Sequence, residues 1–172
     1  DYTKDKHRAV DDRPYGGGAG MVLKVEPIFE TLKKIAGKKE LFTRSAKNKT
    51  RVILTDPDGK IFNQADAIRL SKYKKLIIIS GHYEGIDARV DKLADEKISI
   101  GNYITSSGEV ASMVIVDAVT RLAPGVLGNP ESLAESLNYK HNQNAKSRFD
   151  YPRYTRPEVF SPDGKLKWLT PK

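Results

Sequence analysis

Two stretches of this sequence place small and polar residues directly after an apolar run, as ligand-binding loops do. The first is Ser99–Glu109, where an apolar strand opens into small residues and then a predicted helix, and the second is Leu76–Asp87. Small residues let a ligand approach the backbone, and the start of a helix directs unpaired N–H groups toward it. Ser106 and Glu109 have the spacing of a capping box, which would fix where that helix begins. The two loops together predict one shared ligand pocket.

A third candidate is the glycine run Gly16–Gly20. No Lys-Ser or Lys-Thr follows it, which excludes the phosphate loop of nucleotide triphosphatases, and the Gly-x-Gly-x-x-Gly spacing of dinucleotide sites is missing from the context it needs. The preceding Asp11, Asp12, Arg13 and Tyr15 supply two carboxylates, a guanidinium and an aromatic ring. Such groups beside bare backbone could receive a base and its phosphates by stacking and charge-assisted hydrogen bonds. The alternative is a flexible loop that leads into the first helix.

The elements that must position these loops are predicted as alternating helices and strands. They are a helix over about 27–36, a strand over Arg51–Thr55 with a turn at Asp56–Gly59, a helix over Ala65–Tyr73, a strand over Leu76–Ser80, a helical stripe from Ile86 to Ala94, a strand at Ser99, and a helix from Val110 to Leu122 that ends before Pro124-Gly125. Apolar strands without polar alternation indicate a parallel sheet covered on both faces, so the fold class is α/β. Ligands bind beyond the carboxyl ends of such strands, where Thr55–Gly59, Gly81–Gly85 and Gly101–Gly108 fall.

Composition narrows the class of function. The chain has 172 residues and no cysteine, which excludes disulfides and Cys-based zinc sites, and its three scattered histidines argue against a His-based metal cage. No apolar run approaches the length of a membrane span, and the start lacks the apolar core of a signal peptide, so we expect a soluble, cytoplasmic protein.

The charge of the chain suits a polyanionic partner such as nucleic acid. Thirty Lys and Arg against 22 Asp and Glu give a formal charge of +8. The basic residues cluster at Lys33–Lys39, Arg44–Arg51, Lys72–Lys75 and Lys140–Arg156, which predicts a broad phosphate-facing surface. The alternative, strongest for the first two clusters, is a solvated helix face with ordinary polar loops. After Gly128 the apolar content falls, and residues 138–150 are predicted to form a mobile, basic linker.

Several longer motifs identify a family. They are Val10–Met21, Gly81–Asp87, Ser99–Tyr103, Pro124–Gly128 and Tyr154–Pro157. Over nearly its whole length the chain resembles the bacterial TrmD family. The resemblance implies a tRNA (guanine-N1)-methyltransferase that uses S-adenosylmethionine to methylate guanine 37, just 3′ of the anticodon. It also implies a SPOUT-type deep trefoil knot, a homodimer whose active site lies between two subunits, and Mg²⁺ during catalysis, although no metal-ligand spacing here points to a metal site.

The resemblance also implies a domain plan. Residues 1–137 are expected to form the knotted methyltransferase domain, 138–157 a flexible basic linker, and 158–172 the start of a tRNA-binding region. The family further implies a strand and helix ahead of Asp1 and a small helical domain after Lys172.

Site residues carry over one by one. The matching donor-binding positions are Leu54, Thr55, Pro57, Gly81, Tyr83, Glu84, Gly85, Ser99, Ile100, Gly101, Asn102, Tyr103, Ile104, Thr105, Ser107 and Gly108. The matching substrate-binding positions are Arg13, Tyr15, Gly17, Gly18, Gly20, Met21 and Arg156. For Tyr83 and Tyr103 the alternative is packing in the core. Three positions depart from the common family residue: Ser107 replaces a glycine, Ala111 a proline and Asn102 an aspartate, changes that could alter affinity for the donor.

Methyl transfer to guanine N1 requires a base for the N1 proton and a cation for the charge that develops on the purine oxygen. The resemblance assigns the base to Glu135, where the family has an aspartate, and the cation to Arg121; Asp11 is the second acidic candidate. A solvated, purely structural Glu135 is the alternative. Two other functions stay open at this point: a basic RNA-binding domain without catalysis, and a SPOUT methyltransferase with another RNA substrate.

Overall fold

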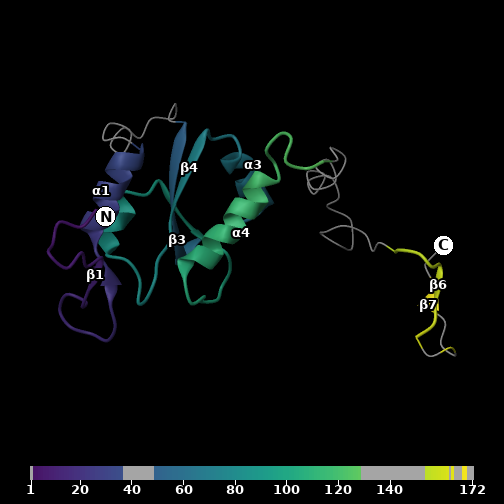
Figure 1. The fold of residues 1–172 in the computed structure, drawn as a ribbon, viewed down its shortest axis with the longest axis horizontal. Helices are drawn as coiled ribbons and strands as arrows, with labels where there is room; N and C mark the ends of the chain where they lie inside the picture. The colour runs from purple at the N-terminus through teal and green to yellow at the C-terminus, as the bar shows by residue number, and fades with distance from the viewer. Residues whose placement is uncertain (1, 37–48, 129–153, 163, 165–167, 170–172) are drawn as a thin grey trace. The chain divides into compact units, whose positions relative to one another are not determined.

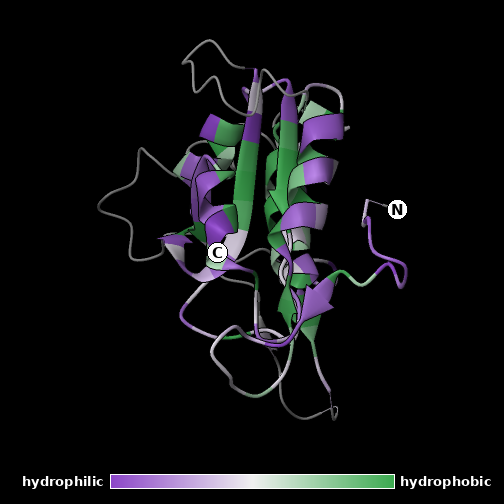
Figure 2. Ribbon diagram, turned by 90° about the vertical axis from the view of Figure 1, so that its left-hand side faces the viewer, coloured by the Kyte–Doolittle hydropathy of each residue, from purple (hydrophilic) through white to green (hydrophobic). Residues whose placement is uncertain are grey.

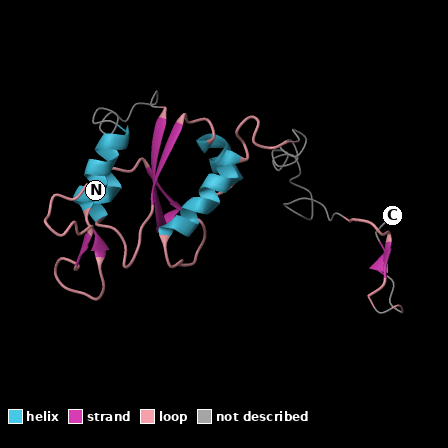
Figure 3. Cartoon of the chain, in the orientation of Figure 1, coloured by secondary structure: helices cyan, strands magenta, loops and turns pink. Residues whose placement is uncertain are grey.

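The computed structural model describes residues 2–36, 49–128, 154–162, 164 and 168–169. The chain divides into two compact units, Asp1–Val126 and Leu127–Lys172, which we treat separately. The first unit is built on a three-stranded sheet with helices on both of its faces (Figures 1 and 3). No helix within the described ranges is long and apolar enough to cross a membrane.

The sheet is parallel, as the uninterrupted apolar strands predict. Its order is β4 (Lys75–Ile79), β3 (Thr50–Ile61) and β5 (Glu96–Ser99), so the longest strand lies in the centre. Val52 pairs with Ile77 on one side of β3, and Ile53 pairs with Glu96 on the other. All three strands therefore point their carboxyl ends the same way, and the loops that follow them meet at one edge of the sheet. This arrangement confirms the α/β class.

Two hydrophobic clusters cover the two faces of the sheet. On one face, Leu32 of α1 (Val25–Ala36) and Val90 of the short 3₁₀ helix η1 (Ala88–Lys92) pack with Val52 and Leu54 of β3. On the other, Leu70 of α3 (Gln64–Leu70) and Ile115 of α4 (Gly108–Thr120) pack with Ile53 of β3. Successive β3 residues point to opposite faces, and burial of each large apolar side chain contributes roughly 1.5–3 kcal/mol. The strands are accordingly green between more hydrophilic helix surfaces in Figure 2.

Side chains near their own ends stabilise the helices α1 and α3. Glu26 in the first turn of α1 and Lys33 and Lys34 in its last turn oppose the partial charges of the helix ends. Asn63 caps α3, because its side-chain oxygen accepts hydrogen bonds from the backbone N–H groups of Ala65 and Asp66 at 2.9 and 3.2 Å.

Three local predictions were wrong. The turn expected at Asp56–Gly59 lies inside β3 as a bulge, with Thr55 and Lys60 both opposite Ile98 of β5. The stripe from Ile86 forms only the 3₁₀ helix η1, because it buries Val90 and Ala94 within a short connection between β4 and β5. The third error concerns the start of α4.

The expected capping box at Ser106 and Glu109 does not form. The N-cap of α4 is Ser107, one residue later, and its side chain makes no capping hydrogen bond. The helix start is fixed instead by the backbone, since the N–H of Gly108 donates to the carbonyl oxygen of Gly81 at 2.8 Å.

Two small hairpins complete the described structure. In the first unit, β1 (Asp11–Asp12) pairs antiparallel with β2 (Val22–Leu23), and the glycine run lies between them. In the second, β6 (Val159–Phe160) pairs antiparallel with β7 (Trp168–Leu169). The proposed linker core, residues 138–150, lies outside the described residues.

Asp87 makes the acid stability of the first unit testable. It caps η1 by accepting the Arg89 backbone N–H at 2.9 Å, and it pairs with the Arg89 guanidinium at 2.6 Å. These hydrogen bonds lower the pKa of Asp87 to about 2. A carboxyl with a lowered folded-state pKa stabilises the protein above its unfolded pKa and loses that contribution as pH falls through the folded value. We expect Asp87→Asn to reduce the free energy of unfolding near neutral pH, and the difference from the parent to shrink between about pH 4 and pH 2. Urea unfolding across that range measures it, and a difference independent of pH would contradict the assignment.

Candidate active site

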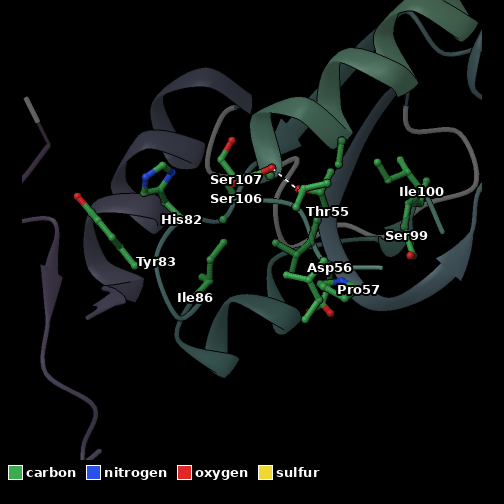
Figure 4. Close-up of a pocket in the computed structure, with 18 of the residues that line it drawn as sticks. Thr55, Asp56, Pro57, His82, Tyr83, Ile86, Ser99, Ile100, Ser106 and Ser107 are labelled. Carbon is green, nitrogen blue, oxygen red and sulfur yellow. Dashed lines mark hydrogen bonds between the residues drawn. The ribbon is translucent and has the colours of Figure 1, made fainter. Parts of the chain in front are cut away.

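Residues 54–57 of β3 and the loops that follow β4 and β5 line one cavity of about 470 Å³, shown in Figure 4. The structure thus brings the predicted donor-binding positions together, with Gly101 and Asn102 as the exceptions, since these two are not among the lining residues. The predicted positions that line it are Leu54, Thr55, Pro57, Gly81, Tyr83, Glu84, Gly85, Ser99, Ile100, Tyr103, Ile104, Thr105, Ser107 and Gly108.

One part of the cavity wall is a close contact between Gly81 and Gly108. Besides the hydrogen bond between their backbones, a Cβ on Gly108 would lie 2.6 Å from the Gly81 nitrogen and 2.8 Å from the Thr55 hydroxyl oxygen. That hydroxyl donates to the carbonyl oxygen of Ile79 at 3.1 Å. These contacts hold Thr55 of β3, the end of β4 and the start of α4 against one another. They leave room only for glycine at position 108.

The loop after β5 is shaped by its own short-range contacts. The buried Ser99 hydroxyl donates to the Gly101 carbonyl oxygen at 2.9 Å, and the Tyr103 hydroxyl donates to the Ile100 carbonyl oxygen at 3.2 Å. The Tyr103 ring lies directly over Gly101, whose φ is +155°. Tyr103 and Tyr83 are 58% and 61% exposed, so the alternative interpretation of these rings as core residues was wrong.

The glycine run between β1 and β2 is joined to the cavity through Glu84. The Met21 N–H donates to Glu84 Oε2 at 3.1 Å, and the Glu84 N–H donates to the Met21 carbonyl oxygen at 3.2 Å. Gly20, at φ +78°, has no room for a side chain because the Glu84 carboxylate occupies that space. The proposed substrate positions Arg13, Tyr15, Gly17, Gly18, Gly20 and Met21 lie on one loop, which Gly20 and Met21 join to the cavity residue Glu84, and Tyr15 is fully exposed.

The same chain matches a known family along almost all of its length. The family model described as tRNA (guanine-1)-methyltransferase TrmD covers residues 1–165. The chain belongs to the TrmD family. It is 49% identical over 161 residues to a tRNA (guanine-N(1)-)-methyltransferase of Dictyoglomus turgidum, with 93% of this chain and 59% of that protein aligned. It is 45% identical over 171 residues to the Koribacter versatilis protein of that name, with 93% and 63% aligned. For the Clostridium novyi protein of that name the identity is 46% over 169 residues, with 98% and 64% aligned. The chain thus spans about three fifths of the length of these curated relatives.

Of the residues that the TrmD resemblance offers for catalysis, the two that the structure describes, Asp11 and Arg121, do not line the cavity. Asp11 is half-buried in β1, paired with Leu23 of β2. Arg121 is the C-cap of α4, whereas the N-terminal end of the same helix lines the cavity. Glu135 lies outside the described residues, and Arg156 belongs to the second unit. A helix rises about 1.5 Å per residue, so Arg121 starts about 20 Å along α4 from Gly108.

Carboxylates dominate the charge of the cavity lining. Asp56, Glu84 and Asp91 line it. Lys97 lies beside two of them, with its Nζ 3.2 Å from Asp91 Oδ2 and 3.5 Å from Asp56 Oδ2. The hydrogen bond with Asp91, assisted by Asp56, raises the pKa of Lys97. The lining therefore favours a ligand that carries positive charge.

One further pair lies at the edge of the cavity. His82 Nδ1 is 3.8 Å from Glu109 Oε2 in the first turn of α4. Hydrogen bonds from the backbone N–H of Glu109 itself and from the Ser107 hydroxyl lower the pKa of Glu109. Glu109 is therefore an anion across the neutral range and attracts a protonated His82.

Sequence reasoning missed several lining residues. They are Asp56, His82, Ile86, Asp91, Ile98, Ser106 and Ala111. His82 and Ser106 lie within the predicted loops and Asp56 directly follows Thr55, so position along the chain could have found these three. Asp91 and Ile98 carry no such signal, because only the packing of η1 beside β5 brings them to the cavity. Across the described residues, no group of three or more His, Asp or Glu side chains could hold a metal ion.

Proposed function

We propose that this chain is the methyl-donor-binding and catalytic part of a tRNA (guanine-N1)-methyltransferase that acts on guanine 37 with S-adenosylmethionine. The observation that carries the proposal is the cavity at the carboxyl ends of three parallel strands, lined by the positions that match the family's donor site. The relatives named above are tRNA (guanine-N(1)-)-methyltransferases, which supports the reaction. As in the family, we take the fold to be a SPOUT trefoil knot, with the domain at 1–137, the linker at 138–157 and the tRNA-binding region from 158. Because its proposed substrate is tRNA, we place the protein in the cytoplasm.

The residues present fit S-adenosylmethionine. A cavity of about 470 Å³ lies within the usual range of small-molecule sites, about 300–1,000 Å³. Apolar Ile98 and Ile100 and the ring of Tyr103 offer contacts for a flat base. The carboxylates of Asp56, Glu84 and Asp91 suit a ligand with a sulfonium and an ammonium group. When bound, the donor supplies an electrophilic methyl group.

The chemistry at guanine is then left to two protein groups. Glu135 would remove the N1 proton, so that the ring nitrogen can take the methyl group from the sulfonium of the bound donor, with Asp11 as the second candidate base. Arg121 stabilises the negative charge that develops on the purine oxygen. The glycine loop, held by Glu84, positions the target nucleotide through Arg13 and the ring of Tyr15.

The position of Arg121 supports a homodimeric site. Ala111 also lines the cavity, and from the C-cap of α4 an arginine side chain does not bridge the roughly 15 Å along the helix back to it. The same helix also carries solvent-exposed apolar side chains at Val110, Met113, Val114 and Val116, between 45% and 71% exposed. Patches of this kind mark interaction surfaces. We therefore propose that α4 packs against a second copy of the chain, whose cavity receives Arg121.

Calorimetric titration of S-adenosylmethionine into the purified chain tests the donor site. We expect saturable binding of one donor per chain, followed by methylation of a tRNA transcript with guanine after its anticodon and none when adenine replaces that guanine. Absence of donor binding would overturn the methyltransferase assignment and leave a basic RNA-binding domain.

A further inference from the structure

The end of the sheet opposite the cavity carries a cluster of exposed lysines: Lys49, Lys72, Lys74 and Lys75. They lie where β3 and β4 begin, whereas the cavity lies where these strands end. A strand rises about 3.3 Å per residue, so the six residues from Lys49 to Thr55 separate the two regions by about 20 Å. We call these four residues the amino-end cluster.

The backbone holds the cluster together. The N–H groups of Lys74 and Lys75 both donate to the carbonyl oxygen of Lys49, at 2.9 and 3.1 Å. Thr50 and Lys75 are then partners in the parallel ladder. The Lys75 ammonium donates to the Ile35 carbonyl oxygen at the end of α1. The backbones of Lys49, Lys74 and Lys75 are therefore fixed and adjacent. A partner would need to order only the side chains that extend from them into solvent.

The nearby carboxylates do not neutralise the cluster, because other cations already hold them. Glu96 accepts two hydrogen bonds from Arg69, at 2.9 and 2.7 Å, and one from Arg51 at 2.7 Å. Burial raises the pKa of Glu96, but the hydrogen bonds from the two guanidinium groups outweigh burial and lower it.

Two further carboxylates are held in the same way. Asp66 lies 2.6 Å from Lys60 and 3.2 Å from Arg69, and Asp95 accepts the Val52 N–H at 2.8 Å and lies 4.0 Å from Arg51. Within the described part of the chain, none of the four lysines of the amino-end cluster has a carboxylate partner. Their positive charge is therefore exposed to solvent, and its natural complement is a row of phosphates.

We propose that the amino-end cluster binds phosphates of the RNA substrate at a distance from the nucleotide that enters the cavity. The proposal rests on the tRNA methyltransferase function proposed above. A partner that occupies the cavity and also reaches about 20 Å to the cluster must be an extended polyanion, which a folded RNA is and a free nucleotide is not. Lysines bind phosphates in this way without reading sequence, so the cluster contributes affinity and orientation and leaves the choice of nucleotide to the cavity and the glycine loop.

The test compares two triple variants with the same reduction in charge. Lys49→Gln, Lys72→Gln and Lys74→Gln together remove three charges from the cluster and leave Lys75 on α1. Lys4→Gln, Lys6→Gln and Lys92→Gln remove three exposed charges elsewhere in the first unit. Binding of an unmodified tRNA transcript is measured for both, and for the parent, at several salt concentrations.

We expect the cluster variant to bind tRNA about tenfold more weakly at low salt and to lower the slope of log K against log salt by about three, one for each lysine that no longer pairs with a phosphate. The control variant should stay within about twofold of the parent, and restoring the charges as Lys→Arg at the three positions should restore binding. Equal weakening in the two triple variants, an unchanged slope, or no salt-dependent tRNA binding by the parent would each overturn the proposal.

Donor titration separates this result from a failure of the proposed function. The cluster variant should bind S-adenosylmethionine as the parent does, because its substitutions lie at the opposite end of the sheet. Absence of donor binding in the parent would refute the methyltransferase assignment itself, whereas normal donor binding with unchanged tRNA affinity in the cluster variant would refute only the proposed phosphate binding.

Discussion

Gly108→Ala should abolish measurable donor binding and destabilise the first unit. The added methyl group would meet the Gly81 nitrogen at 2.6 Å, the Thr55 hydroxyl oxygen at 2.8 Å and the Gly81 carbonyl oxygen at 3.1 Å. Two of these atoms are backbone, so the contact is relieved only by moving the start of α4 away from the end of β4. Such overpacking costs up to about 3 kcal/mol, a large part of the roughly 5–15 kcal/mol typical of a folded domain. The displaced loops should weaken donor affinity by about 100-fold or more.

Calorimetric titration and urea unfolding measure the two effects, and another glycine provides the control. Among the described residues, a Cβ on Gly128 would meet nothing within 4 Å, so Gly128→Ala should change neither donor affinity nor stability by much. If Gly108→Ala bound the donor as the parent does, the contact between Gly81 and Gly108 would not form the wall of the donor site.

The sheet was predictable from the sequence because its strands are buried on both faces. Val52, Ile53 and Leu54 show no polar alternation, and this pattern alone indicates a covered parallel strand. The position of the cavity followed from the same reasoning, since parallel strands bring the loops after Thr55, Ser80 and Ser99 to one edge.

The details that failed depend on contacts between segments far apart in the sequence. Asp56–Gly59 has the composition of a turn. The strand β3 nevertheless resumes after it, because Thr55 and Lys60 both pair with Ile98 of β5. Ser106 has the spacing of a cap, yet the hydrogen bond from Gly108 to Gly81 sets the start of α4 one residue later. The composition of a short segment does not indicate that Ile98 or Gly81 will be its partner.

The glycine loop shows the same limit within the candidate site. Its Arg13 and Tyr15 suggest a base-binding role from their types alone, but the link to the cavity through Met21 and Glu84 joins residues 63 positions apart. The resemblance to the TrmD family supplied what neither spacing nor composition contained, namely the roles proposed for Arg121 and Glu135.

Arg121→Met should leave donor affinity unchanged and reduce kcat for methyl transfer by about 100- to 1,000-fold, the usual cost of removing one group that stabilises developing charge. Arg121 begins about 15 Å along α4 from Ala111, the cavity-lining residue of that helix nearest to it, so we expect its removal to leave the donor site unchanged. Glu135→Gln should also affect the rate and not the donor affinity. Methyl transfer should be abolished and donor binding kept, because the amide cannot accept the N1 proton. An equal decrease in donor binding and rate in Glu135→Gln would contradict its assignment as the base.

Mixing two inactive chains decides whether Arg121 serves its own cavity or that of a partner. The Arg121→Met chain keeps an intact donor cavity, and the Gly108→Ala chain keeps its arginine. If α4 presents Arg121 to the second copy, each mixed dimer contains one cavity and one arginine that complete each other. An equal mixture that exchanges freely should then recover about a quarter of the parent activity per chain, since half of the dimers are mixed and each has one working site.

If Arg121 instead reached the cavity of its own chain, every site in the mixture would lack either the arginine or the donor, and no activity would return. Met113→Glu supplies the control for assembly, because Met113 is 71% exposed on α4 and a carboxylate there opposes the packing of two apolar helix faces. Sedimentation should show this variant as a monomer that still binds donor. Adding the substitution to both inactive chains should remove the recovered activity, because the mixed site exists only while the two helices are in contact.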